Sequence, residues 1–198
     1  MERLGRDFFD RDTVTVAREL LGKTVVRILP DGRQVAGTIT ETEAYIGRMD
    51  KACHAYNYRR TARTETLFAP PGTAYVYLIY GMHHCLNFVT EPEGEPSAVL
   101  IRGISPLENG DIIAENRFGR KMADMTAYQR KHFLNGPGKV CAGLALTRAD
   151  NGTDTTAPGS SLYLLDGPAP AAIGVGKRIG IDYAEEAVDF PWRFWRME

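Results

Sequence analysis

Two glutamates between residues 35 and 45 are well placed for acid–base chemistry. The run VAGTITETEAY predicts a strand, in which every second side chain points to the same face. One face of that strand would hold Val35, Gly37, Ile39, Glu41, Glu43 and Tyr45. A carboxylate that is partly removed from water has a raised pKa and becomes a stronger base, so Glu43 could deprotonate a water molecule. The alternative is that both glutamates pair with surface arginines or lysines.

A tyrosine-rich run, AYVYLIY at residues 74–80, could bind a flat ring. On a strand, Tyr75 and Tyr77 share one face, while Tyr80 lies on the other and precedes Gly81, where a ring can project. Tyrosine rings stack on nucleobases and offer edges for hydrogen bonds. The alternative is a tyrosine-rich sheet core. A nucleic-acid partner is favoured by the nearby basic residues Arg59, Arg60 and Arg63.

The histidines do not predict a metal site. His83 and His84 are adjacent, so on a strand they point to opposite faces and cannot easily share an ion. His54 lies alone in a loop segment with Asp50, where a solvated side chain is the plain interpretation. The chain has no CxxC pair of the kind that holds zinc. We therefore expect neither a metal nor a cofactor.

Two glycine-rich motifs could cradle phosphate. NGPGK at 135–139 could present backbone N–H groups, with Lys139 adding charge, although a turn that starts a helix explains it equally well. Its spacing is not that of a nucleotide P-loop. The run IGVGKRIG at 173–180 lacks both the dinucleotide-binding spacing and a following βαβ unit, so we reject a dinucleotide site.

The elements that must position these residues alternate between hairpins and helices. Helical spacing predicts a helix over 13–21 that ends at Gly22, and Asp31-Gly32 predicts a hairpin between strands at 23–29 and 33–45. Further strands are expected at 74–80, 98–104, 161–166, 173–181 and 191–195. A capping box beginning at Ser105 predicts a helix within 107–132, and another helix is expected at 140–146. This order predicts an α+β fold, a single domain over 1–198 with a curved antiparallel β-sheet and flanking helices.

Composition sets few limits on the partner. The 198 residues carry a net charge of −1, which does not by itself favour nucleic acid, and no apolar run is long enough to cross a membrane. Residues 111–139 hold only three acidic residues. The basic residues of this segment are Arg117, Arg120, Lys121, Arg130, Lys131 and Lys139. This pattern fits either a basic face or a mixed solvated surface. The chain has an odd number of cysteines, namely Cys53, Cys85 and Cys141, which indicates a reducing compartment.

Taken together, seven segments resemble the alkyladenine (3-methyladenine) DNA glycosylase family over nearly the whole chain. They are RLGRDFFD (3–10), ETEAY (41–45), DKACH (50–54), PGTAYVYLIYGMHHCLN (71–87), AVLIRGISPLE (98–108), NGPGKVCAGLAL (135–146) and GKRIGI (176–181). The combination of ETEAY with YVYLIYGM is highly specific, whereas either motif alone would be weak.

The resemblance implies a base-binding pocket around a general base. Glu43 matches the residue that activates the attacking water, and Tyr45 matches a ring that stacks on one side of the flipped base. His54 and Tyr77 match the opposite wall, and the backbone amide of His54 matches the donor to the edge of the base.

The same resemblance implies contacts around this pocket. Tyr80 matches the residue that intercalates into the duplex, and Asn87 matches a pocket residue that helps to exclude normal guanine. Arg102 matches a second catalytic residue, which helps to hold the water and the neighbouring phosphate. Ile179 matches an apolar residue whose backbone touches the water. We also expect contacts with the DNA backbone from Arg63, His83 and Lys139.

The implied activity is that of a monofunctional DNA glycosylase in base excision repair. It would flip alkylated purines, namely 3-methyladenine and also 7-methylguanine, hypoxanthine or ethenoadenine, out of double-stranded DNA and hydrolyse the glycosidic bond. The motifs contain no lysine that could form a Schiff base, so no lyase activity is expected. We expect a monomer that binds no membrane, in the cytoplasm or nucleoid of a prokaryote or in a eukaryotic nucleus.

Two departures from the family and two rival functions remain. His83 stands where a relative carries a tyrosine near the DNA, and the insert at 117–133 matches the family poorly, so it could define a local DNA-binding surface. One rival is a non-catalytic binder of damaged nucleotides, which would need the aromatic residues but not Glu43. The other is a hydrolase or deaminase of free nucleosides, which would not need Tyr80.

Overall fold

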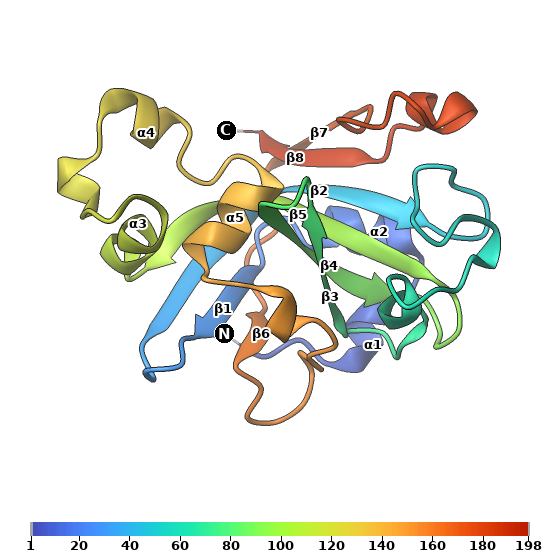
Figure 1. Cartoon of the computed structure of the whole chain (residues 1–198), viewed down its shortest axis with the longest axis horizontal. Coiled ribbons are helices and arrows are strands. Elements are labelled where there is room, and N and C mark those ends of the chain that lie inside the picture. The colour runs from blue at the N-terminus through green and yellow to red at the C-terminus, as the bar shows by residue number, and fades with distance from the viewer. Residues whose placement is uncertain (1, 198) are drawn as a thin grey trace.

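A twisted antiparallel β-sheet organises the structure, a computed structural model that describes residues 2–197. Six strands follow the order β3-β4-β5-β2-β1-β6, and β8 pairs with both β2 and β7 (Figure 1). Each of the strand pairings is antiparallel. The strands are β1 (Thr24–Ile28), β2 (Gln34–Ile46), β3 (Ala74–Ile79), β4 (His83–Thr90), β5 (Ser97–Glu108), β6 (Leu162–Leu165), β7 (Ala172–Gly176) and β8 (Arg193–Met197).

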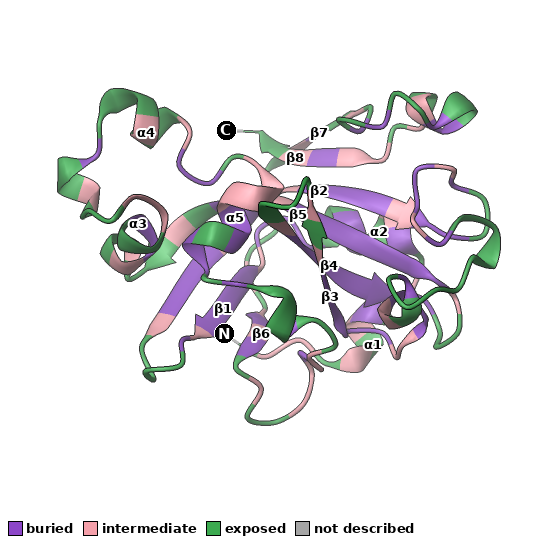
Figure 2. Ribbon diagram, in the orientation of Figure 1, coloured by how far each residue is buried: buried purple, intermediate pink, exposed green. Residues whose placement is uncertain are grey.

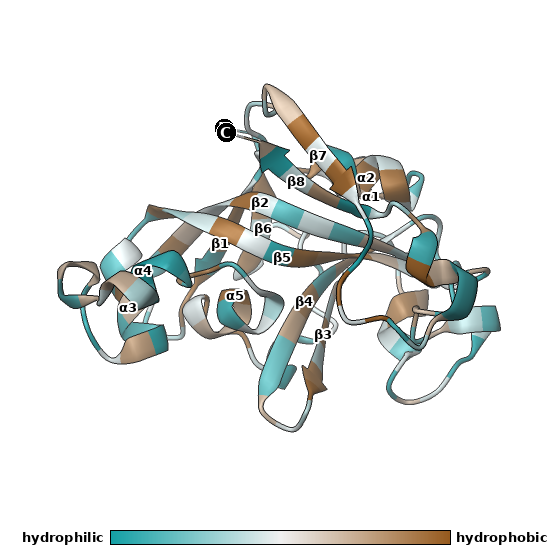
Figure 3. Ribbon diagram, turned by 90° about the horizontal axis from the view of Figure 1, so that it is seen from above, coloured by the Kyte–Doolittle hydropathy of each residue, from teal (hydrophilic) through white to brown (hydrophobic). Residues whose placement is uncertain are grey.

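Helices cover both faces of the central strands. They are α1 (Arg6–Phe9), α2 (Thr13–Glu19), α3 (Gly110–Phe118), α4 (Ala127–Lys131) and α5 (Pro137–Gly143). Short 3₁₀ turns lie at Tyr56–Tyr58, Glu65–Phe68, Met122–Asp124, Arg148–Asp150 and Glu185–Asp189. Figures 1 and 3 place α2 on one side of β2 and β5 and α5 on the other. The expected α+β class, with a curved antiparallel sheet and flanking helices, is therefore confirmed.

The main hydrophobic core lies where α2, α3 and α5 pack on the central strands, and Figure 2 shows these strands as largely buried. Its largest fully buried side chains include Phe9, Phe88, Phe194, Leu20 and Ile113. Burial of such a side chain stabilises a fold by about 1.5–3 kcal/mol. The core thus fixes the central strands that carry the candidate site residues.

The prediction that a helix begins at the capping box of Ser105 is wrong. Residues 105–108 instead extend β5, and Ser105 and Pro106 pair with Thr38 and Gly37 of β2. Proline fits there because it lies at a register shift, next to the pair Ala36–Glu108, where the regular ladder is interrupted. Pairing with β2 overrides the local helix signal, and α3 begins only at Gly110.

The predicted single face from Val35 to Tyr45 is also wrong, because β2 does not alternate regularly. Its pairing with β5 shifts register between Ile39 and Glu41 and again between Glu41 and Thr42. The main core takes Val35 and Ile39 before the shifts and Ala44 after them. An extra residue in one strand reverses which side chains face the core. Glu43 and Tyr45 consequently lie on the face opposite Ala44, away from the main core.

The remaining elements match the sequence to different degrees. Gly22 follows α2 as expected, and the hairpin at Asp31-Gly32 joins β1 to β2. The strand β4 had no prediction of its own, and the strand expected over 173–181 ends at Gly176. The helix expected at 140–146 begins earlier, at Pro137.

Replacing Gly22 with alanine is expected to lower the Tm by more than the same change at Gly32. Both glycines have positive φ, 86° and 84°, which costs an L-residue about 1–2 kcal/mol. A Cβ on Gly22 would lie 2.1 Å from the carbonyl oxygen of Pro168, whereas one on Gly32 meets nothing within 4 Å. Thermal unfolding of Gly32→Ala should show a loss of roughly 2–8 °C. An equal or smaller loss for Gly22→Ala would contradict the predicted clash.

Candidate active site

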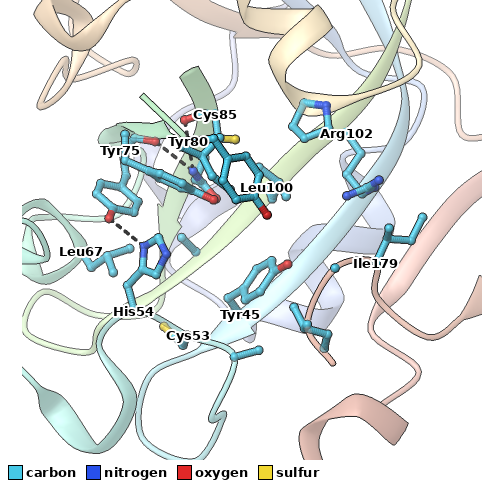
Figure 4. A pocket seen from close by; sticks show the side chains of 18 of the residues that line it. Tyr45, Cys53, His54, Leu67, Tyr75, Tyr80, Cys85, Leu100, Arg102 and Ile179 are labelled. Atoms are coloured by element: carbon cyan, nitrogen blue, oxygen red, sulfur yellow. Dashed lines mark hydrogen bonds between the residues drawn. The ribbon is translucent and has the colours of Figure 1, made fainter. Parts of the chain in front are cut away.

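A pocket of about 170 Å³ opens between the sheet and the loops that follow β2 and β7 (Figure 4). Figure 4 shows His54 and Tyr75 at one end, Arg102 and Ile179 at the other, and Tyr45 between them. The sequence-predicted residues that line it are Tyr45, His54, Tyr77, Tyr80, Asn87, Arg102 and Ile179. The fold thus brings together residues from five separate segments of the chain.

Glu43 lies directly behind this lining and is not itself part of it. The residue is 0 % exposed, and both carboxylate oxygens are engaged. The hydroxyl of Tyr45 donates to Oε2 at 2.7 Å, and the backbone N–H of Ile179 donates to Oε1 at 2.8 Å. Arg102 Nε lies 3.5 Å from Oε1. All three partners line the pocket, so Glu43 is one residue removed from the pocket space.

Burial determines the acidity of Glu43. Loss of water raises the pKa of its carboxyl group, while Arg102 and the hydrogen bonds from Tyr45 and Ile179 oppose that rise. The net pKa is raised, because the loss of water is the largest contribution. The arrangement therefore makes Glu43 a stronger base than an exposed glutamate, while its two donors fix the direction of both oxygens.

A second carboxylate, that of Glu41, contacts the same nitrogen of Arg102. Glu41 Oε1 accepts hydrogen bonds from Arg102 Nε at 3.1 Å and from Arg193 Nε at 2.6 Å. Arg102 is only 13 % exposed, so these charges interact with little screening. Glu41 thereby anchors Arg102 at the edge of the pocket and partly neutralises it.

Tyr45 is held on the face turned away from the pocket. The guanidinium of Arg178 lies 4.7 Å from the centre of its ring. Burial and the neighbouring Glu43 carboxylate raise the pKa of the Tyr45 hydroxyl well above its usual range, so Tyr45 stays a hydrogen-bond donor. The ring face toward the pocket is left for another flat group.

His54, Tyr75 and Tyr77 form the aromatic wall. The His54 ring lies edge-on to Tyr77, with ring centres 4.6 Å apart, and Tyr75 lies 5.2 Å from Tyr77. His54 Nδ1 is 3.0 Å from the Tyr75 hydroxyl, and His54 Nε2 is 3.4 Å from Arg63. Arginine can only donate, which assigns the acceptor role to Nε2 and the proton to Nδ1. Burial and Arg63 lower the pKa of His54 to about 4, so the ring is neutral at pH 7.

Asn87 is buried at the back of the pocket, where it is 4 % exposed. Its amide nitrogen donates to the backbone carbonyl groups of Tyr75 and Cys85 at 3.0 and 3.4 Å. Those bonds tie the side chain to neighbouring strands β3 and β4. Asn87 therefore presents a fixed polar group to whatever enters.

Tyr80 stands at the tip of a projecting hairpin. The turn between β3 and β4 has positive φ at Tyr80 and Gly81, 52° and 69°, as in the two-residue turns that match the twist of paired strands. Figure 3 shows this hairpin extending away from the rest of the sheet. Tyr80 is 83 % exposed, so its ring faces solvent apart from its contact with the pocket rim.

The three residues expected at the DNA backbone lie around the pocket without lining it. Arg63 packs over the Tyr77 ring at 5.5 Å. His83 is exposed at the start of β4, next to Gly138 of α5. Lys139 donates to Asn135 within the turn that begins α5, which fits the helix-starting interpretation of NGPGK.

Sequence reasoning did not identify Asp50 and Arg178 as members of this site. Both side chains are 0 % exposed and form an ion pair beneath Tyr45. The nearby residues His54 and Ile179 were predicted as members of the pocket. The burial of Arg178 could not be predicted, because most arginines are exposed and nothing in the local sequence marks a buried one.

No three histidine, cysteine, aspartate or glutamate side chains are placed to hold a metal ion anywhere in residues 2–197. The three cysteines, all buried, are free thiols. Among the described helices, none is long and apolar enough to cross a membrane.

Comparison with known proteins assigns this fold and site to a family. The family model for methylpurine-DNA glycosylase (MPG) matches residues 7–198. The chain therefore belongs to the methylpurine-DNA glycosylase family, a class of DNA glycosylases that act in the base excision repair of DNA.

Several relatives match almost the full chain, and all are named as candidate 3-methyladenine DNA glycosylases. A protein of Clostridium perfringens (strain SM101) is 50 % identical over 98 % of this chain and 95 % of its own length. One from Methanocella arvoryzae is 53 % identical over 98 % of this chain and 92 % of its own. One from Desulfitobacterium hafniense is 47 % identical over 98 % and 95 %. The sequence resemblance to the family is thus confirmed.

Proposed function

We propose that this protein is a monofunctional 3-methyladenine DNA glycosylase that hydrolyses the bond between a flipped purine and its sugar. Glu43 acts as the general base toward water, and Arg102 stabilises the water and the phosphate beside it. The substrates are alkylated purines in double-stranded DNA, namely 3-methyladenine together with 7-methylguanine, hypoxanthine and ethenoadenine. Family membership and the names of the relatives support the class of reaction.

The observation that carries this proposal is the placement of Glu43 relative to the pocket. Its two oxygens are bound to Tyr45 and to the Ile179 backbone, which both line the space where a base would stack. Each carboxylate oxygen has a second lone pair, so a water admitted beside Arg102 could still donate to Glu43. The same negative charge would stabilise an oxocarbenium-like transition state at the sugar.

The walls of the pocket suit a flat ring. A cationic alkylated base between Tyr45 and the wall of His54 and Tyr77 gains cation–π attraction of about 0.5–2 kcal/mol. His54 adds no positive charge at neutral pH, because burial and Arg63 hold its pKa near 4. Asn87 at the back of the pocket supplies the fixed group that discriminates among purines.

The position of Tyr80 favours a duplex substrate over free nucleosides. A nucleoside hydrolase needs only the pocket, whereas a flipped base leaves a gap in the stack that an inserted ring can fill. Tyr80 is exposed on a projecting turn beside that pocket. Its ring lies at the rim of the pocket and is mostly exposed, so it could enter the base stack beside a flipped base.

The DNA backbone is expected to pass over the basic residues around the hairpin. Arg63, His83 and Lys139 surround the pocket. In the insert at 117–133, four exposed residues make no ion pair with any residue of the described chain: Arg120, Lys121, Arg130 and Lys131. We propose that these groups contact phosphates and offset the small negative net charge of the chain.

The direct test is the release of free base from duplexes that carry one 3-methyladenine, hypoxanthine or ethenoadenine. We expect release from the 3-methyladenine duplex, unchanged by a chelator and without a protein–DNA adduct after borohydride treatment. Failure to release any damaged base would overturn the proposal. Loss of release with chelator would refute metal independence, and a trapped adduct would refute the monofunctional mechanism.

The pH dependence of excision should report the environment of Glu43. The base works when deprotonated, so kcat/KM should fall as pH falls through its pKa, which burial raises above the ordinary value of about 4.3. Glu41→Gln removes the anion between Arg102 and Arg193, which leaves more positive charge near Glu43 and lowers its pKa. The acidic limb of the profile should therefore move to lower pH.

A suitable control for that profile is Glu65→Gln, which breaks only the exposed ion pair with Arg60. Its acidic limb should coincide with that of the wild type. An upward shift for Glu41→Gln, or no shift, would show that Glu41 does not tune Glu43.

We further propose that residues 1–198 act as one glycosylase domain, because one continuous sheet carries the strands of the site, and that the protein is a monomer. The relatives described above come from prokaryotes. A cytoplasmic location with access to the nucleoid follows for a repair enzyme from such a source.

A further inference from the structure

A buried ion pair lies directly beneath the pocket. Both terminal nitrogens of Arg178 donate to the carboxylate of Asp50, and both side chains are 0 % exposed. Arg178 also donates to the carbonyl groups of Ala44 and Ala187. Burying two charges costs several kcal/mol per ion, so such a pair is weak grounds for stability alone. A role in fixing geometry would explain why it is there.

Arg178 contacts the two residues that follow Glu43 in the sequence, Ala44 and Tyr45. Its guanidinium packs on the Tyr45 ring at 4.7 Å and on Trp192 at 5.2 Å, and it binds the carbonyl of Ala44, the residue between Glu43 and Tyr45. The orientation of the Tyr45 ring therefore depends on a charged group that is itself immobilised by Asp50.

The residue after Arg178 completes the arrangement. The backbone N–H of Ile179 donates to Glu43 Oε1, and the hydroxyl of Tyr45 donates to Oε2. One partner of Glu43 is thus bonded covalently to Arg178 and the other is packed against it. Displacement of Arg178 would shift the donors of both carboxylate oxygens together.

We propose that Arg178 and Asp50 form a positioning pair for the proposed glycosylase reaction. The pair holds the Glu43 carboxylate and the Tyr45 ring in one fixed relation without touching the substrate. This inference rests on the proposed function. It adds that the Glu43 carboxylate and the Tyr45 ring must be held in place before the substrate binds. An error of about 1 Å in the position of a catalytic group can cost about 100-fold in rate.

The chain supplies a matched control pair. Arg27 and Asp150 also form a nearly buried ion pair, with side chains 9 % and 10 % exposed. This pair joins β1 to the 3₁₀ turn Arg148–Asp150, and neither residue lines the pocket. Its disruption removes a buried pair without moving a donor of Glu43.

The test compares Asp50→Asn and Arg178→Lys with Asp150→Asn and Arg27→Lys. Three quantities are measured for each folded variant: single-turnover excision of 3-methyladenine at saturating enzyme, the Kd for lesion-containing duplex, and the Tm. We expect all four variants to lose stability. Only the Asp50 and Arg178 variants should excise about 10–100-fold more slowly, with a Kd within about threefold of wild type, since the loss lies in the chemical step.

The conservative change supplies a further readout. Arg178→Lys keeps the charge opposite Asp50 and should excise faster than Arg178→Met, which keeps only bulk. Should Arg178→Met not fold, Asp50→Asn still decides the matter, because it retains the shape of the side chain.

Excision by Asp50→Asn at the wild-type rate would overturn the positioning role. So would an equal slowing in the Asp150 and Arg27 variants, which would show that stability alone limits the rate. Absence of excision by the wild-type protein is a different result, since it would refute the proposed function itself.

Discussion

Glu43→Gln is expected to abolish turnover while leaving the binding of lesion-containing DNA nearly intact. The amide has almost the shape of the carboxylate and can still accept from the Ile179 N–H, but it cannot take a proton from water. Loss of a general base typically costs about 10²–10⁴-fold in rate. Single-turnover release of 3-methyladenine, with Kd measured on the same duplex, separates the two effects.

Glu91→Gln is a good control for that experiment. Glu91 is also buried, at 6 % exposed, and binds Thr13 and Arg48 away from the pocket. Its variant should excise normally once folded. If Glu43→Gln retains full excision, a different group activates the water. If neither the variant nor the wild type excises but both bind, the protein is a binder of damaged bases.

Tyr80→Ala should have the second-largest effect, and it should depend on the substrate. Without the ring, the gap left by a flipped base stays open, so part of the unstacking cost of a few kcal/mol is no longer recovered. A loss of about 1–3 kcal/mol of stacking corresponds to roughly 5–150-fold weaker excision from duplex DNA. Excision from a single strand, where no stack must be broken, should change far less.

Two variants distinguish insertion from general surface effects. Tyr80→Phe keeps the ring and should behave like the wild type. Leu107→Ala removes another large solvent-facing side chain, 56 % exposed, from the end of β5 beyond Arg102 and should not alter excision. Equal losses on duplex and single-stranded substrates would assign Tyr80 to the pocket and not to the stack.

Much of the fold was predictable because local signals and tertiary pairing agree. The β-prone composition of AYVYLIY predicts β3, and Tyr80 falls at its end as expected. The segment 105–108 shows the opposite case: its capping box is a sound local signal, yet pairing with β2 makes these residues part of a strand. Local propensity is worth less than the hydrogen bonds and packing of a central strand.

Site residues that lie together in one sequence motif could be predicted. Contacts between residues from separate loops could not. ETEAY places Glu43 beside Tyr45, and the structure joins the two by a hydrogen bond. The contact of Arg178 with Asp50 joins residues 128 positions apart, so no sequence window contains it. The register shift that turns Glu43 to the face opposite Ile39 also depends on β5, a strand more than fifty residues later.

That register shift makes the site sensitive to chain length. Insertion of one residue between Thr42 and Glu43, beyond the shift, would exchange the two faces of β2 from that point on. Glu43 would then face the main core, and Ala44 would face the pocket. The exposed segment 119–121 between α3 and α4 has no such constraint, so this protein should accept inserted or deleted residues there and reject an insertion in the second half of β2.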